Sequence, residues 1–182
     1  MLGFLRRLLG PTGSISQREA NEWLGYCKEN PMVAFPGGAL TKIVNTPEGV
    51  AAILSAEDNG ESAIYILIKL CEKYRIISGP NGALANIAHT PEGLETIAAC
   101  LGVEIDGRSV LSILNAVIKD MTADYAKASV LGILAEKVPG VRERLAKEPG
   151  GSPELGITVL SEDARLSWDG TKPSNGDAPS PS

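Results

Sequence analysis

Apolar residues recur at helical spacing along most of the first 148 positions of the chain. The first helix is expected from Ser16 to about Asn30, because the sequence S-Q-R-E places a hydroxyl at the N-cap and Glu19 three residues later. Pro31 ends this helix, and the following stretch PMVAFPGG contains two prolines and two glycines. This stretch is predicted to form a turn or a short distorted helix.

Two segments of the chain have nearly the same sequence, GALTKIVNTPEGVAAIL at 38–54 and GALANIAHTPEGLETIA at 82–98. In each, a threonine can cap a helix, a proline occupies the first helical position, and a glutamate lies near the positive end of the helix dipole. The capping residues Thr46 and Thr90 are 44 residues apart. This spacing lies within the period of about 40–47 residues that is typical of armadillo and HEAT helical repeats.

Each copy continues with a polar turn, AEDNGE or VEIDGR, and then with an apolar segment at 62–74 or 109–121. The isoleucine and tyrosine content of 62–74 also suits a buried strand, but its equivalence to the more helical 109–121 favours a helix. One further helix is expected over 123–137 and a short one over 141–148. The pattern predicts an all-α fold, a short right-handed armadillo-like α-solenoid of about three repeat units formed by 16–148.

The amino-terminal residues 1–15 form a separate amphipathic or targeting-like segment, with arginines among its leucines and no acidic residue. Two interpretations stay open. The segment is a short helix that caps the core through Leu5, Leu8 and Leu9, or it is a transit-peptide-like address. Contact of residues 1–10 with a membrane surface is the less favoured alternative.

The carboxy-terminal residues 149–182 are interpreted as a linker, EPGGSP, followed by a short apolar motif and a disordered tail. The motif contains Leu160, Leu166 and Trp168. It either packs back on the helical domain or acts as an interaction motif.

The charge and composition of the chain argue against nucleic-acid binding and indicate an aliphatic core. A net charge of −5 argues against nucleic-acid binding, because no strongly basic block is present to neutralise phosphates. Apolar residues make up 43% of the chain and aromatic residues only 4%, so the core must be aliphatic. The three cysteines, Cys27, Cys71 and Cys100, are widely separated, which favours free buried thiols in a reducing compartment.

Sequence signatures of catalysis are lacking. The single histidine, His89, lies just before a capping threonine, where it is expected to end a helix. No nucleophile elbow or phosphate-binding loop occurs, and Glu57, Asp58 and Glu61 lack EF-hand spacing and are interpreted as a solvated acidic turn. We therefore expect a non-enzymatic protein without catalytic residues, metal site or cofactor.

Polar residues form a stripe on each of the two apolar segments. The stripes are Tyr65, Lys69 and Lys73 at i, i+4 and i+8, and Ser112, Asn115 and Lys119 at i, i+3 and i+7. In a stacked solenoid such helices line the concave surface, where a peptide or a partner helix can be held by hydrogen bonds and charges. The alternative is that each stripe is only the solvated side of a mostly buried helix.

The sequence ALANIAHTPEGLETIAACL resembles the junction between two armadillo repeats. More narrowly, NTPEGVAAIL and HTPEGLETIA are similar to armadillo units in the inhibitory region of diaphanous-type formins. The resemblance covers residues 38–138 and implies an amphipathic helix and a small GTPase of the Rho family as partners. The chain departs from that family in its short length and in lacking a formin actin-binding domain.

These observations favour a cytoplasmic adaptor or scaffold that binds a protein or peptide partner through the two stripes. A permanently assembled structural subunit of a larger organellar or virion complex is the alternative function. A mitochondrial location is the alternative compartment, because the arginines and leucines of 1–15 overlap with a transit-peptide pattern.

Overall fold

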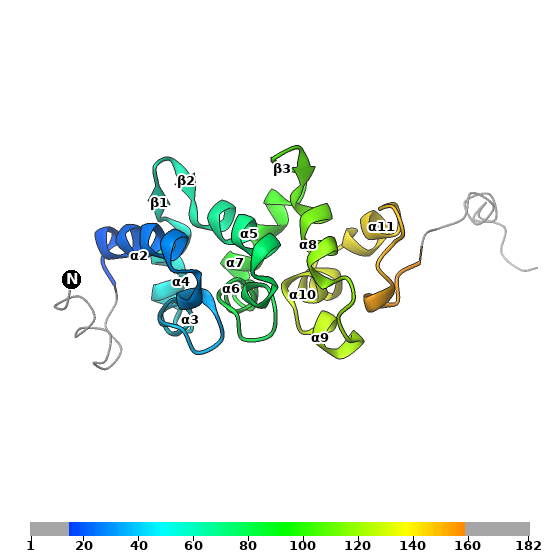
Figure 1. Cartoon of the computed structure of the whole chain (residues 1–182), viewed down its shortest axis with the longest axis horizontal. Coiled ribbons are helices and arrows are strands. Elements are labelled where there is room, and N and C mark those ends of the chain that lie inside the picture. The colour runs from blue at the N-terminus through cyan, green and yellow to red at the C-terminus, as the bar shows by residue number, and fades with distance from the viewer. Residues whose placement is uncertain (1–14, 159–182) are drawn as a thin grey trace, which may run out of the picture.

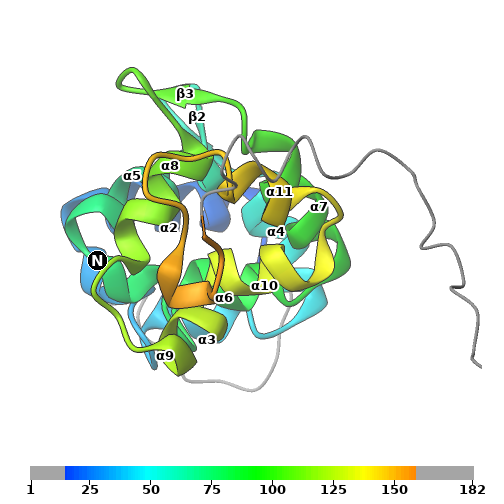
Figure 2. The ribbon, with the colours of Figure 1, turned by 90° about the vertical axis from the view of Figure 1, so that its right-hand side faces the viewer.

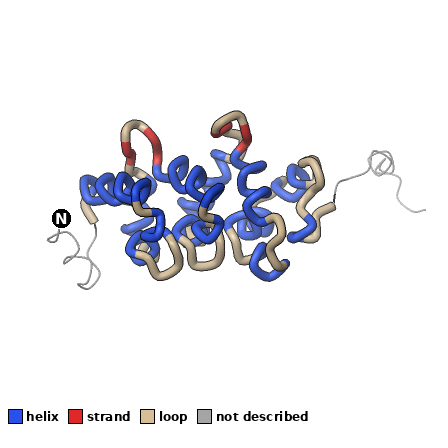
Figure 3. Tube along the Cα trace, viewed as in Figure 1, coloured by secondary structure: helices blue, strands red, loops and turns tan. Residues whose placement is uncertain are grey.

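The computed structural model describes residues 15–158, which are mostly helical, as the sequence predicts (Figure 3). Within this part the α-helices are α2 Gln17–Glu29, α3 Ala39–Ile43, α4 Pro47–Leu54, α5 Ala63–Lys73, α6 Ala83–Ala88, α7 Pro91–Cys100, α8 Val110–Ile118, α9 Ala123–Lys127, α10 Val130–Lys137 and α11 Val141–Leu145. The remaining elements are three 3-10 helices, η1 Pro31–Ala34, η2 Arg75–Ile77 and η3 Pro153–Leu155, and four strands, β1 Glu57–Asp58, β2 Glu61–Ser62, β3 Glu104–Ile105 and β4 Arg108–Ser109. The segments 62–74 and 109–121 are helical rather than extended.

Hydroxyl caps begin the longer helices of the described chain. The caps of α2, α5 and α8 are Ser16, Ser62 and Ser109, and those of α4, α7 and α10 are Thr46, Thr90 and Ser129. Each side-chain oxygen accepts a hydrogen bond from the backbone N–H three residues later. The capping box predicted at Ser16 and Glu19 is confirmed.

The single helix predicted over 123–137 is wrong, because the chain forms two helices, α9 and α10, that meet at Ser129. The Ser129 hydroxyl donates to the Ala126 carbonyl at 2.6 Å and accepts from the Gly132 N–H at 3.4 Å. Thr46 and Thr90 make the same pair of bonds at the starts of α4 and α7. Ser129 therefore begins a third copy of the threonine-capped helix, one that lacks the proline and glutamate of the other two.

The two polar turns form β-hairpins instead of simple loops. Strand β1 pairs antiparallel with β2, and β3 pairs with β4, each across a two-residue turn. Asn59 and Gly60 have φ values of 53° and 79°, and Asp106 and Gly107 have φ values of 50° and 78°. Positive φ at both central residues is the requirement of a type I′ turn, which Asn-Gly and Asp-Gly meet at low cost.

Helices α2, α5 and α8 follow one another along the long axis of the molecule, with both hairpins on one side (Figure 1). Viewed along that axis, α4, α7 and α10 lie across from them, and α3, α6 and α9 lie opposite the hairpins (Figure 2). One continuous aliphatic core fills the space between these rows, with Leu24, Leu67, Leu84 and Ile97 fully buried.

The described carboxy-terminal residues pack on the last helices. Leu155 and Ile157 are buried, and Ser152 and Ile157 bond each other's backbone. The Asp120 N–H donates to a Glu154 carboxylate oxygen at 3.2 Å. Part of the stretch interpreted as a linker thus contacts the region where α8 ends. The predicted motif residues Leu160, Leu166 and Trp168 lie outside the described part of the chain, as do residues 1–14 of the predicted amino-terminal segment 1–15.

We expect Gly93→Ala to destabilise the protein, because an added Cβ would collide with the carbonyl oxygen and side chain of Ile87. Overpacking of this kind costs about 1–3 kcal/mol, to be measured by urea unfolding. Gly102→Ala is the matched control, since the nearest atom to its Cβ, on Arg144, lies 3.8 Å away. Equal unfolding midpoints for the two variants would contradict the packing argument.

Candidate interaction surface

The two predicted stripes lie on α5 and α8, which pack side by side. Lys69, Lys73 and Lys119 are exposed, whereas Tyr65, Ser112 and Asn115 are half-buried. When the helices are aligned on their caps Ser62 and Ser109, Tyr65 matches Ser112. Asn115 then matches Ile68, and Lys119 matches Glu72. The structure brings the two stripes onto neighbouring helices, but the stripes share only one equivalent position.

Lys69 already has partners within the protein. Its Nζ lies 3.5 Å from an Asp106 carboxylate oxygen at the tip of the β3–β4 hairpin and 5.8 Å from the centre of the Tyr65 ring. Both members of the ion pair are well exposed, so the pair contributes about 1 kcal/mol at most. A partner that uses Lys69 must compete with Asp106.

Asn115 is also occupied. Its Nδ2 donates a hydrogen bond of 3.0 Å to the Gly151 carbonyl. Ile68, the equivalent residue of α5, is fully buried, and α8 packs against α5. The carboxy-terminal segment is thus bound at a position where α5 carries a buried isoleucine. A polar residue suits this position because the segment offers main-chain groups to bind.

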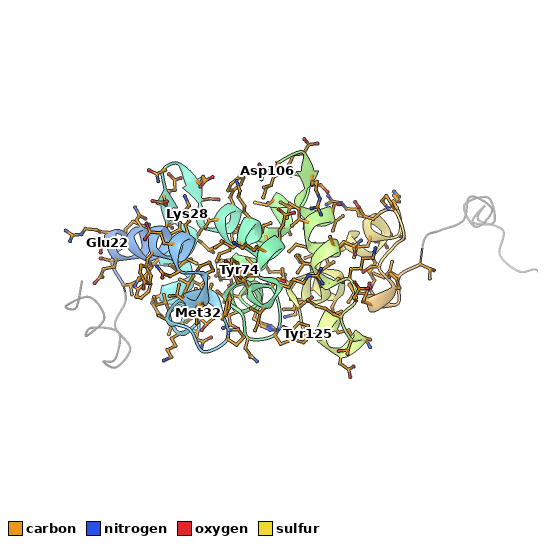
Figure 4. The ribbon with its side chains drawn as sticks, viewed as in Figure 1. Glu22, Lys28, Met32, Tyr74, Asp106 and Tyr125 are labelled. Carbon is orange, nitrogen blue, oxygen red and sulfur yellow. The ribbon has the colours of Figure 1, made fainter. Side chains whose placement is uncertain are left out.

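The half-buried rings of Phe35 and Tyr74 meet near the ends of α2 and α5, and the exposed Met32 and Ile76 lie two or three residues from them in the chain. We call these four residues the junction patch. The Phe35 and Tyr74 ring centres are 5.9 Å apart, while Met32 is 73% and Ile76 39% exposed. Figure 4 labels Met32 and Tyr74 near the ends of their helices. The patch combines half-buried rings with exposed flexible side chains, a composition common at interaction sites.

Met32 and Ile76 occupy equivalent positions after α2 and α5. Each lies two residues after a helix-ending residue, Asn30 with φ −130° and ψ 71° or Tyr74 with φ −125° and ψ 75°. They are 44 residues apart, the same interval as the threonine caps. Sequence reasoning missed the patch, although this repeat interval was the signal that could have found it.

Basic residues lie near the patch at the ends of α5 and α8. Lys73 Nζ lies 5.3 Å from the centre of the Tyr74 ring, and Arg75 Nη1 donates to the Lys119 carbonyl at 3.2 Å. Within residues 15–158, no carboxylate lies within ion-pair distance of Lys73, Arg75 or Lys119. The patch therefore has a positively charged border that can receive an anionic partner.

Ion pairs of opposite polarity connect the β1–β2 hairpin to α2 and the β3–β4 hairpin to α5. Lys28 on α2 lies 2.6 Å from Asp58 and 2.7 Å from Glu61, whereas Glu72 on α5 lies 2.5 Å from Arg108. Glu61 and Arg108 occupy the same position of their hairpins. Hydrogen bonds to Asp58 and then Glu61 raise the pKa of Lys28. Two acids of the predicted solvated turn thus bind a lysine.

The histidine and the three cysteines of residues 15–158 differ in their exposure. His89 is exposed at the end of α6. Burial raises the pKa of Cys27 to about 12 and also raises the pKa of Cys71, so both thiols stay protonated. Cys100 is half-buried.

Among residues 15–158, no group of three or more histidines, cysteines and acids is placed to hold a metal ion. None of the helices in this part of the chain has the length and apolarity needed to cross a bilayer.

We expect Lys28→Met to lower stability at pH 7 by about 1 kcal/mol, because Asp58 and Glu61 lose their shared cation. Folding raises the pKa of Lys28 above the ordinary lysine pKa of about 10.4. The stabilisation from this lysine is therefore complete below a pH of about 10.4 and is lost as the pH rises through the pKa of the folded state. Urea unfolding should therefore show a smaller alkaline loss of stability in the variant than in the natural chain. Both proteins carry the same cysteines, so parallel curves above pH 10.4 would contradict this role for Lys28.

We expect Asn115→Ala to release the carboxy-terminal segment from α8, because the Gly151 carbonyl loses its hydrogen bond. A lost bond of about 1 kcal/mol predicts a rise of roughly fivefold in amide hydrogen exchange over 151–157. Ser112→Ala, one turn earlier on the same helix, is the control and should leave exchange unchanged. If both variants behave alike, the Asn115 bond does not hold the segment.

Comparison with known proteins finds no matching family model, no matching curated protein and no matching solved structure. The armadillo resemblance therefore rests on the sequence of residues 38–138. The candidate surface rests on the geometry of α5, α8 and the junction patch.

Proposed function

We propose that this chain is a non-enzymatic protein–protein interaction module built as a short right-handed armadillo-like α-solenoid of about three units. The recurrence of the hydroxyl caps supports three units, each with one long, one short and one intermediate helix. The alignment of α2, α5 and α8 along one axis supports stacking of these units.

The junction patch is the observation that carries the function. The exposed Met32 and Ile76, the contacting rings of Phe35 and Tyr74, and the nearby Lys73 offer a partner both apolar contact and charge. Methionine and aromatic residues are enriched in the buried centres of protein interfaces. The partner is therefore a protein or peptide that combines bulky apolar side chains with carboxylates.

The bond between Asn115 and the Gly151 carbonyl gives further support. It is an example, within the chain itself, of a helix side chain that binds the main chain of another segment. Tyr65, Lys69, Lys73, Ser112 and Lys119 would extend such contacts along α5 and α8. The resemblance to formin inhibitory regions adds an amphipathic helix or a small GTPase as the class of partner, in a cytoplasmic adaptor or scaffold.

Lys73→Glu tests this function, because it reverses a charge beside the Tyr74 ring without breaking an ion pair. We expect partner capture from a source lysate, quantified by mass spectrometry, to fall by about tenfold, which corresponds to about 1.4 kcal/mol. Lys137→Glu on α10 is the control, since Lys137 is also exposed and α10 lies across the molecule from α5 (Figure 2).

Circular dichroism should first show that both variants are folded. Capture of the same proteins by both variants in equal amounts would contradict the proposal. That result would favour the permanently assembled structural subunit, whose contacts are spread over other surfaces.

A further inference from the structure

Contacts connect the described carboxy-terminal segment to the end of α5, where part of the junction patch lies. Glu154 accepts a hydrogen bond from the Asp120 N–H, and the adjacent Lys119 carbonyl accepts one from Arg75. Arg75 directly precedes Ile76 of the patch. A short series of contacts therefore connects the carboxy-terminal segment to the patch.

The next residues of the chain have the chemistry that the patch lacks. Residues 159–170, VLSEDARLSWDG, combine bulky apolar side chains with three acidic residues and one arginine. The apolar residues are Val159, Leu160, Leu166 and Trp168, and the acidic ones are Glu162, Asp163 and Asp169. The acids complement the cations that border the patch, and the apolar residues complement Met32 and Ile76.

The length of the chain permits contact with the patch. Ten residues separate position 158 from Trp168 and span about 33 Å when extended, or about 15 Å as a helix. Helices that pack side by side are about 8–10 Å apart, so this reach covers the distance of one to three helices. A tether of this length also gives a local concentration in the millimolar range.

We propose that residues 159–170 dock on the junction patch of the same molecule, with Trp168 against Met32, Tyr74 or Ile76. The Glu162 and Asp163 carboxylates then lie near Lys73 and Arg75. A partner that uses the patch must displace this segment, so the segment lowers the partner's apparent affinity. The inference shares its surface with the proposed function but requires no external partner.

The test measures the accessibility of Trp168 by acrylamide quenching of the full chain. The only other tryptophan, Trp23, is 1% exposed, and a Trp168→Phe variant measures its contribution. We expect the quenching constant of Trp168 to rise about threefold or more in Ile76→Asp. Salt at 1 M should also raise it, because the screening length falls to about 3 Å.

Two further variants keep the test independent of folding defects. Met32→Asp changes the most exposed residue of the patch and should have the same effect as Ile76→Asp. Val103→Asp is the control, since Val103 is 47% exposed but lies beside the β3–β4 hairpin, and it should leave quenching unchanged.

Three results would overturn the proposal. Trp168 could be as accessible in the natural chain as in urea, or it could stay protected in both patch variants. Protection that weakens on dilution would instead assign the patch to a second copy of the chain. If Glu162→Lys/Asp163→Lys exposes Trp168 but leaves partner capture unchanged, the proposed function fails while the intramolecular contact stands.

Discussion

The fold depends on a hydroxyl cap that joins two helices with almost no loop between them. This cap is made by the side chains of Thr46, Thr90 and Ser129. Each hydroxyl donates a hydrogen bond to the backbone carbonyl three residues earlier and accepts one from the backbone N–H of a glycine three residues later. The glycine has no Cβ, so the second helix can begin directly against the end of the first. This sharp bend, made three times, sets the short helices apart from the longer ones and allows successive units to share one core.

Sequence reasoning found the elements that are determined by local bonds. The caps at Ser16, Thr46 and Thr90 bind neighbours three residues away, so their patterns are visible in a few letters. The break at Ser129 was missed because S-V-L-G lacks the proline and glutamate that mark the other copies. The hairpins were also missed, although Asn-Gly and Asp-Gly between short strands are strong signals for a type I′ turn.

The candidate surface was harder to predict, because its decisive contacts join residues far apart in the chain. Helical spacing placed Lys69 and Asn115 on α5 and α8, but it could not reveal that Asp106 and Gly151 occupy them. The junction patch lies partly in 3-10 segments, where the 3.6-residue period does not determine which side chains are exposed. Only the repeat interval indicates these residues, and that interval becomes informative once the successive units are aligned.

The opposite polarity of the hairpin ion pairs distinguishes two hairpins that have the same backbone pairing. The first hairpin brings Glu61 to Lys28, whereas the second brings Arg108 to Glu72. If the hairpins were exchanged, Glu61 would face Glu72 and Arg108 would face Lys28, and like charges would repel. The two hairpins therefore have the same backbone pairing but are not interchangeable. Moving either hairpin to the other site would require a compensating change of charge on the helix that it contacts.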